Sequence, residues 1–249
     1  MKISIITVAF NAARTIADTL ESVAAQTHAE IEHIVVDGAS TDGTLQIIER
    51  HRKHISRLIS EPDQGIYDAM NKGLVLAKGE IIGFLNADDV YAHNGVLERV
   101  SATMAKDGLD ALFGDAEFVN PDRPDQPVRR YRSERFHPKR IAWGWMPAHP
   151  ALFLRRYVYE RFGMFRTDYR IAGDFELVAR MFHGDTLTYR HLPEVLVRMQ
   201  TGGVSTGGWR NTILLNKEVL RACRENGIQT SLPKILSKYP AKLLEFLRR

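Results

Sequence analysis

The chain has 249 residues, 44% of them hydrophobic and 26% charged, which is typical of a folded globular protein and excludes a disordered, collagenous or disulfide-rich chain. Its apolar runs are far shorter than the roughly 20 residues that span a bilayer, and its one cysteine, Cys223, excludes an internal disulfide. The net charge is +4, but residues 221–249 hold seven basic and two acidic side chains. We therefore expect a cytoplasmic protein without a signal peptide and with no nucleic-acid partner.

The first 90 residues alternate between strand and helix patterns. Residues 3–9 form an apolar run of strand length, and residues 16–24 repeat apolar side chains at helical spacing. The pattern continues with expected strands at 31–37, 56–60 and 81–85 and expected helices at 41–50 and 66–77. Such alternation predicts an α/β fold, with a mostly parallel sheet flanked by helices.

The patterns after residue 90 are weaker. Residues 120–140 contain four prolines and a cluster of basic side chains, which predicts a mobile basic loop. The remaining expected elements are helices at 95–105, 174–182, 208–226 and 233–248 and strands at 111–119 and 187–199.

Acidic and amide side chains follow each of the first four expected strands. Ligands of open α/β sheets bind outside the carboxyl ends of the strands, so these groups should converge at one edge of the sheet. The chain has no Gly-x-Gly-x-x-Gly and no P-loop sequence. A carboxylate-rich edge suits a hard cation such as Mg²⁺ or Mn²⁺, which can also bind phosphate oxygens. A nucleoside diphosphate held through a metal would satisfy this pattern.

Four motifs together resemble the family 2 glycosyltransferases. They are residues 4–11 (SIITVAFN), 35–44 (VVDGASTDGT), 65–73 (GIYDAMNKG) and 79–89 (GEIIGFLNADD). The resemblance is dense over 1–90 and thinner over 146–206, and is strongest to bacterial enzymes that build capsule, exopolysaccharide or colanic-acid-type polymers. It implies a GT-A fold and an inverting transfer from a UDP- or GDP-linked sugar to a saccharide or lipid-linked saccharide, with Mn²⁺ or Mg²⁺.

The resemblance also implies how the chain is divided and which residues bind the donor. Residues 1–206 would be the GT-A domain, with a donor half at 1–90 and an acceptor half at 91–206, and residues 207–249 a helical extension. Asp37 would accept from the nucleobase imide, although a turn aspartate is the structural alternative. The implied donor-binding residues are Thr7, Asn11, Asp37, Gly38, Asp68, Asn71, Asn86, Ala87 and Asp88.

Residues 86–88 (Asn-Ala-Asp) stand in place of the family's Asp-x-Asp motif, so the first carboxylate is replaced by an amide. Asp88 is then the expected metal ligand, with Asp89 as the alternative. For Asp68, the structural alternative is a surface ion pair with Lys72, four residues further along the same helix.

Asp174 is the expected catalytic base. It lies in residues 171–180 (IAGDFELVAR), where Gly173 replaces the first acidic residue of the family's usual pair. A helix-capping role is compatible with catalysis, and Glu176 is the fallback base. The candidates for acceptor or loop contacts are His149, Trp145, Gly203 and Ser205. A structural histidine, a core tryptophan and an ordinary glycine turn are the alternatives for these.

Residues 233–249 combine an apolar helical side with lysines and resemble an interfacial helix on anionic lipid. If the tail binds lipid, the protein would be peripheral at the inner face of the cytoplasmic membrane, whereas packing on the core is the alternative. Two other function classes stay open. Asn86 and Gly173 allow a catalytically inactive sugar-nucleotide-binding module. A sugar nucleotidyltransferase would need a basic loop after the first strand, where residues 7–11 have none.

Overall fold

The structure is a computed structural model that describes residues 1–120, 123–184, 186–201 and 208–239. Its first half contains β1 (Ile3–Ala9), α1 (Ile16–Ala24), β2 (Ile31–Asp37), α2 (Thr44–Arg50), β3 (Arg57–Ser60), α3 (Ile66–Leu76) and β4 (Ile81–Phe84), with a short 3-10 turn, η1 (Arg52–His54), after α2. These elements confirm the predicted alternation. β1 lies between β2 and β4, and β3 lies outside β2, all in parallel register.

The second half continues the same sheet in mixed orientation. Its elements are β5 (Asp89–Tyr91), α4 (Val96–Asp107), β6 (Ala111–Asn120), β7 (Arg123–Tyr131), η2 (Ser133–Arg135), η3 (Pro138–Trp143), η4 (His149–Ala151), β8 (Leu152–Arg155), α5 (Arg156–Phe162), α6 (Gly173–Phe182), β9 (Tyr189–Gln200), α7 (Trp209–Glu225) and α8 (Leu232–Leu236). The strand order is β3-β2-β1-β4-β8-β6-β9-β5, with β7 on β6. β8 runs antiparallel to both β4 and β6. The sheet is therefore parallel in its first half and mixed in its second.

The prediction of a mobile loop at 120–140 is wrong. Residues 123–131 form β7, which pairs antiparallel with β6, and two 3-10 turns follow it. β7 pairs with β6 alone, and a strand with one free side tolerates prolines because a missing N–H can face outward. The register also shifts between Phe118 and Asn120, opposite Pro127.

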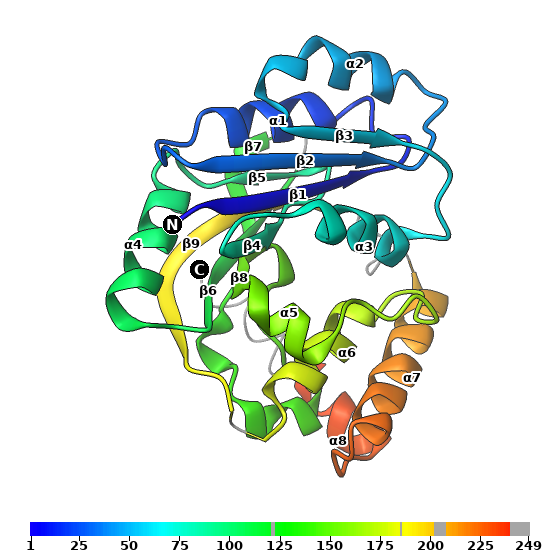
Figure 1. The fold of residues 1–249 in the computed structure, drawn as a ribbon. Coiled ribbons are helices and arrows are strands. Elements are labelled where there is room, and N and C mark those ends of the chain that lie inside the picture. Colours follow the sequence, from blue (N-terminus) through cyan, green and yellow to red (C-terminus); the bar gives the residue numbers. More distant parts are fainter. Residues whose placement is uncertain (121–122, 185, 202–207, 240–249) are drawn as a thin grey trace.

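The helices cover both faces of the parallel half (Figure 1). Side chains alternate along β1, so Ile6 and Val8 join the cluster under α3, whereas Ala9 packs with α1 and α2. Nearer the N-terminal end of β1, Ile3 and Ile5 lie in a third cluster with α4. Burial of both faces explains why the strands are near-continuous apolar runs.

α7 and α8 pack into the same core as the sheet. Val219, Ala222 and Cys223 of α7 and Ile235 of α8 belong to the largest buried cluster, which also holds residues of α3 and α6. Among the helices that the structure describes, none is long and apolar enough to cross a membrane. Gly203, Ser205 and residues 240–249 of the tail lie outside the described residues.

Candidate active site

Asp37 ends β2 beside the end of β1. Its side chain is fully buried, and Oδ2 accepts from Ser60 Oγ at 2.7 Å and from the Ser40 N–H at 3.2 Å. Oδ1 is buried and has no hydrogen-bond partner among the described residues. A buried acceptor without a partner is costly unless a ligand supplies a donor, and this is what a nucleobase N–H would do.

Asn11 and its neighbours bind the loop after β2 to the loop after β1. Asn11 adopts a left-handed backbone with φ of 50°. Its Oδ1 accepts from the Thr41 N–H at 2.9 Å, and its own N–H donates to Ser40 Oγ at 2.8 Å. Asp42 accepts from the Thr44 hydroxyl and from two backbone N–H groups, so its pKa is lowered mainly by the Thr44 bond. Ser40 and Asp42 thus shape the loops.

Gly38 allows a close approach that a side chain would block. A Cβ at this position would lie 2.3 Å from Asp63 Oδ2 and 3.4 Å from the Phe10 ring. Asp63 follows β3 and therefore reaches across to the end of β2. It is a candidate that the motifs did not single out, although its place after the third strand was a signal.

The Asn86–Asp89 turn follows β4. Asp89 is only 2% exposed, and Asn86 Nδ2 donates to its Oδ2 at 3.0 Å. Burial and the charge of Asp88 raise the pKa of Asp89 well above its ordinary value. A carboxylate at position 86 would face this buried carboxylate, so the amide is the compatible choice. Asn86 Oδ1 is buried without a partner among the described residues.

Asp88 is the partly exposed carboxylate of this turn. Burial raises its pKa, and among the described residues none forms an ion pair or a side-chain hydrogen bond with the Asp88 carboxylate. Ala87 packs instead into the apolar cluster of α1 and α2. Asp37 and the Asn86–Asp88 turn flank β1 on opposite sides, which puts them about 10 Å apart, or two strand spacings.

Asp174 is the second residue of α6. Its Oδ1 accepts from the Phe175 N–H at 2.8 Å and lies 3.5 Å from the Tyr67 hydroxyl. Burial raises the pKa of Asp174, against the opposing charge of His149. Burial lowers the pKa of His149, which stacks on Phe84 with ring centroids 5.5 Å apart.

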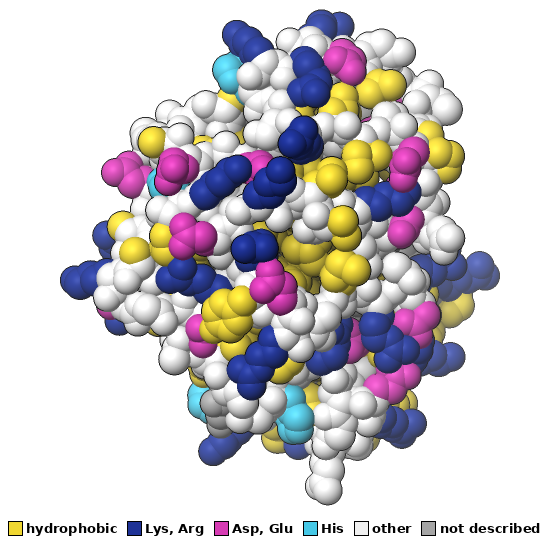
Figure 2. Space-filling model, viewed as in Figure 1, with side chains coloured by type: hydrophobic (Ala, Val, Ile, Leu, Met, Phe, Trp, Pro, Cys, Tyr) yellow, Lys and Arg dark blue, Asp and Glu magenta, His cyan; other side chains and the backbone are white. Residues whose placement is uncertain are grey.

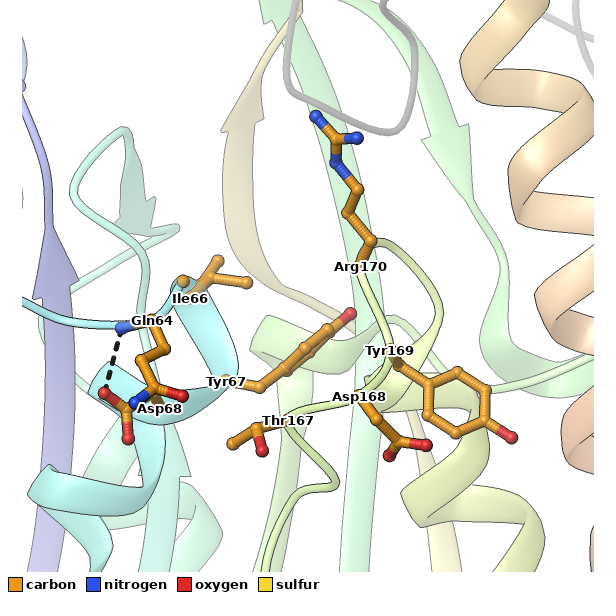
Figure 3. Close-up of a pocket in the computed structure, with 9 residues that line it drawn as sticks. Gln64, Ile66, Tyr67, Asp68, Thr167, Asp168, Tyr169 and Arg170 are labelled. Carbon is orange, nitrogen blue, oxygen red and sulfur yellow. Dashed lines mark hydrogen bonds between the residues drawn. The ribbon is translucent and has the colours of Figure 1, made fainter.

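A cleft of about 330 Å³ opens between the start of α3 and the segment before α6. One wall is Gln64–Asp68, the other is Thr167–Arg170, and Tyr67 points across toward the second wall (Figure 3). The Tyr67 hydroxyl donates to the Ile171 carbonyl at 2.7 Å. Tyr67 therefore joins the donor half to Asp174, a contact between distant residues that no local pattern revealed.

Asp68 and Asn71 both lie on α3 but face different partners. Asp68 lines the cleft, accepts from the Gln64 N–H at 3.0 Å, and lies 3.6 Å from Lys72 Nζ. Asn71 Nδ2 donates to the Phe165 carbonyl at 2.8 Å, and Oδ1 accepts from the Phe165 N–H at 2.9 Å. The polar atoms of Asn71 are thus already used within the protein.

Other expected residues lie away from the cleft. Thr7 is fully buried, with Oγ1 3.0 Å from His33 Nε2. Glu176 is buried in an ion pair with Arg180 at 2.9 Å, which leaves it unsuited as the fallback base. Trp145 is half-buried, with the Arg135 guanidinium 5.6 Å from its ring centre, and lines a second hollow with Trp143.

Comparison with known proteins agrees with this geometry. The sequence model of "Glycosyl transferase family 2" matches residues 4–163. The chain belongs to this family. A "PGL/p-HBAD biosynthesis glycosyltransferase" of Mycobacterium bovis is 32% identical over 226 residues, covering 88% of this chain and 82% of that protein. "Glycosyltransferase AglE" of Haloferax volcanii is 30% identical over 201 residues, covering 76% and 64%. The chain is therefore a glycosyltransferase.

Solved structures of similar fold include proteins with a bound nucleotide or nucleotide sugar. S. aureus TarS 1–349 in complex with UDP has a TM-score of 0.65 at 21% identity, covering 88% of this chain and 66% of that one. The mannosyltransferase PcManGT from Pyrobaculum calidifontis, in complex with GDP-Man and Mn²⁺, has a TM-score of 0.64 at 21% identity, covering 88% and 64%. These likenesses show that the family 2 chain has the GT-A fold.

Proposed function

We propose that this family 2 enzyme is an inverting, divalent-metal-dependent glycosyltransferase of bacterial polysaccharide biosynthesis. It transfers a sugar from a UDP- or GDP-linked donor to a saccharide or lipid-linked saccharide. The observation that carries the proposal is Asp174, a half-buried carboxylate that Tyr67 joins to a cleft beside the donor motifs. In this proposal residues 1–90 bind the donor, 91–206 the acceptor, and 207–249 form an extension.

The donor nucleoside would bind over the tips of β1 and β2. Asp37 Oδ1 supplies an acceptor without a partner among the described residues, and Asn11 fixes the loop beside it. Because Gly38 has no side chain, the Asp63 carboxylate can lie against it and border this site from the β3 side. Asp68 faces the cleft and is the ribose or sugar contact.

The residues after β4 fit a divalent cation. Asp88 is a desolvated carboxylate, and Asn86 Oδ1 is a buried oxygen without a described partner. Within the described ranges, no group of three or more His, Cys, Asp or Glu side chains could hold a metal, so the donor diphosphate must complete the ligand set. A bound Mg²⁺ or Mn²⁺ would neutralise charge on the departing diphosphate.

Asp174 would remove the proton from the acceptor hydroxyl as that oxygen attacks the anomeric carbon. The new C–O bond forms on one side while the bond to the diphosphate oxygen breaks on the other, which inverts the configuration. The diphosphate leaves with the bonding electrons, and the proton stays on Asp174. The charges of His149 and Asp174 interact, and burial lowers the pKa of His149. A neutral imidazole would not form an ion pair with the Asp174 carboxylate, which stays free to accept the proton.

The tail supports peripheral binding to anionic lipid only through its exposed residues. Ile235 is buried in the core, so this part of the predicted apolar face packs on the protein. Leu236 and Trp143 remain 45% and 43% exposed, and Lys234 Nζ lies 4.9 Å from the Trp143 ring centre. Aromatic and basic side chains together favour a membrane interface. Trp143→Ala should weaken sedimentation with phosphatidylglycerol vesicles, with Trp209→Ala as the matched control.

The test of the proposed function is a screen of UDP and GDP sugars with Mn²⁺, with Mg²⁺ and with chelator. We expect one nucleotide to raise the melting temperature only with metal, and its sugar donor to release nucleotide when acceptor is added. Asp174→Asn should keep the thermal shift and lose at least about 10²-fold in turnover. Absence of any metal-dependent nucleotide binding, or near-normal turnover of Asp174→Asn, would contradict the proposal.

A further inference from the structure

Glu218 lies in the middle of α7 and is 8% exposed. Its carboxylate accepts from three successive backbone N–H groups, those of Arg170 at 2.9 Å, Ile171 at 2.9 Å and Ala172 at 2.8 Å. A buried carboxylate is costly unless such donors satisfy it. The side chain and these three amides therefore fix one another.

The three amides belong to the segment that ends at α6. Ala172 directly precedes this helix, and Asp174 is its second residue. The Ile171 peptide is held at both ends, because its N–H donates to Glu218 Oε2 and its carbonyl accepts from Tyr67. A shift of this segment would therefore move the start of α6 and the Asp174 carboxylate with it.

A second connection joins α7 to the same segment at the surface. Glu225 accepts from the Tyr169 hydroxyl at 2.6 Å and pairs with Arg166 and Arg221, at 2.8 and 2.9 Å. These contacts involve side chains, whereas Glu218 holds the backbone itself. The two glutamates of α7 therefore hold the same segment in different ways, Glu225 through its side chains and Glu218 through its backbone.

We propose that Glu218 is a positioning residue for Asp174, acting through the amides of residues 170–172. The inference rests on the proposed role of Asp174 as the base. It gives α7 a function in catalysis, although this helix lies beyond the part of the chain that the family model matches. Precise placement matters because a displacement of about 1 Å at a reacting group can lower the rate about 10²-fold.

The test compares Glu218→Gln with Glu225→Gln in the full chain. Turnover is measured with the nucleotide sugar found in the screen, and backbone amide exchange is followed by mass spectrometry. For Glu218→Gln we expect kcat to fall at least about tenfold, with the donor KM within about twofold of wild type, and faster exchange at 170–172 and at Phe175, whose N–H bonds Asp174. Glu225→Gln should keep kcat within about twofold, because the backbone bonds remain.

A KM-against-kcat split separates positioning from loss of fold, since a loosened structure would also weaken donor binding. Wild-type kcat in Glu218→Gln, or equal losses in both variants, would overturn the proposal. If Glu218→Gln fails to fold, Tyr67→Phe frees the other end of the Ile171 peptide and should show the same split. If the wild-type protein turns over no nucleotide sugar, the proposed function fails. The exchange of Phe175 in Glu218→Gln then decides the positioning role, and unchanged exchange there contradicts it.

Discussion

Asn71 can be tested for two different roles, stabilising the fold or binding the donor. It is a donor-binding candidate by motif, yet its amide makes two hydrogen bonds to the backbone of Phe165, which is 4% exposed. Asn71→Ala would leave a buried N–H and a buried carbonyl without these partners. Each buried group left without a partner costs about 1–3 kcal/mol, so the two together would lower the free energy of unfolding by about 2–6 kcal/mol if no water replaced the lost bonds. Because Asn71 is itself half-buried, water can replace part of the loss, and we expect about 2–3 kcal/mol.

Urea unfolding of Asn71→Ala, Asn71→Asp and wild type measures this free energy. Asn71→Asp keeps the acceptor for the Phe165 N–H and loses only the donor, so it should lie between the other two. Nucleotide binding with Mn²⁺, measured by titration calorimetry under conditions where each variant is folded, should change little. If Asn71→Ala unfolds like wild type but no longer binds nucleotide, Asn71 binds the donor and its two hydrogen bonds to Phe165 do not stabilise the fold.

Four further predictions concern the carboxylates and the glycine before Asp174. Because burial raises the pKa of Asp174, turnover should fall on the acid side at a higher pH than an ordinary aspartate requires. The buried charge also lowers stability as pH rises through that pKa, so Asp174→Asn should melt higher than wild type at pH 7. Gly173→Ala places Cβ 2.7 Å from the Tyr67 ring and should lose about 1–3 kcal/mol in urea unfolding. Asp88→Asn should abolish the Mn²⁺-dependent thermal shift with UDP or GDP while unfolding normally without ligand.

The parallel half of the fold could be predicted because each element carries its own pattern. β1 and β2 are apolar runs that two layers of helices bury, and α1 and α3 have clear apolar faces. β8 and α5 had no such signal. β8 has four residues and exists because β4 and β6 pair with it from both sides. β5 was missed for the same reason, because its partner β9 lies far along the chain and such pairing overrides weak local preference. β7 forms a hairpin with β6, the strand directly before it, and its prolines hid the strand pattern.

The residues of the candidate site also differ in how far the sequence could predict them. Residues at strand ends, such as Asp37 and Asp88, could be found because topology alone brings the ends of parallel strands together. Contacts made by the rest of the chain could not. Tyr67 meets Asp174 across 107 positions, and Thr7 directs its hydroxyl to His33 within the core. The motifs contain these positions but do not reveal which of their atoms are already used within the protein.

The residues at 86 and 173, where the chain departs from the pattern of the family that it resembles, have local structural explanations. Asn86 donates to the buried Asp89 where a carboxylate would repel it. Gly173 leaves room for the Tyr67 ring, whose hydroxyl supports the segment before Asp174. Asp174 keeps a raised pKa, a bond to the Phe175 N–H and support from Tyr67, as the proposed base would. The two substitutions are therefore compatible with the roles proposed for Asp88 and Asp174.

Charged and aromatic side chains are distributed differently over the surface of the protein. Basic and acidic side chains are interspersed over the face shown in Figure 2, and hydrophobic side chains gather near its middle. Cations instead stand over aromatic rings near the C-terminal helices, with Lys234 on Trp143 and Arg135 on Trp145. The hollow that these tryptophans line also contains Arg140 and Lys238. This basic and aromatic surface is therefore the one on which the proposed contact with anionic lipid depends.

The C-terminal helices belong to the same folded unit as the sheet even though the sequence pattern changes before them. α7 places Val219, Ala222 and Cys223 in the largest core cluster, and Glu218 fixes the backbone before the base. An enzyme that ended before α7 would lack these side chains, so it would expose the core residues that they cover and leave the amides of residues 170–172 without their carboxylate partner. The extension is thus a structural condition for the active site, because the segment that carries Asp174 has its backbone partners on α7.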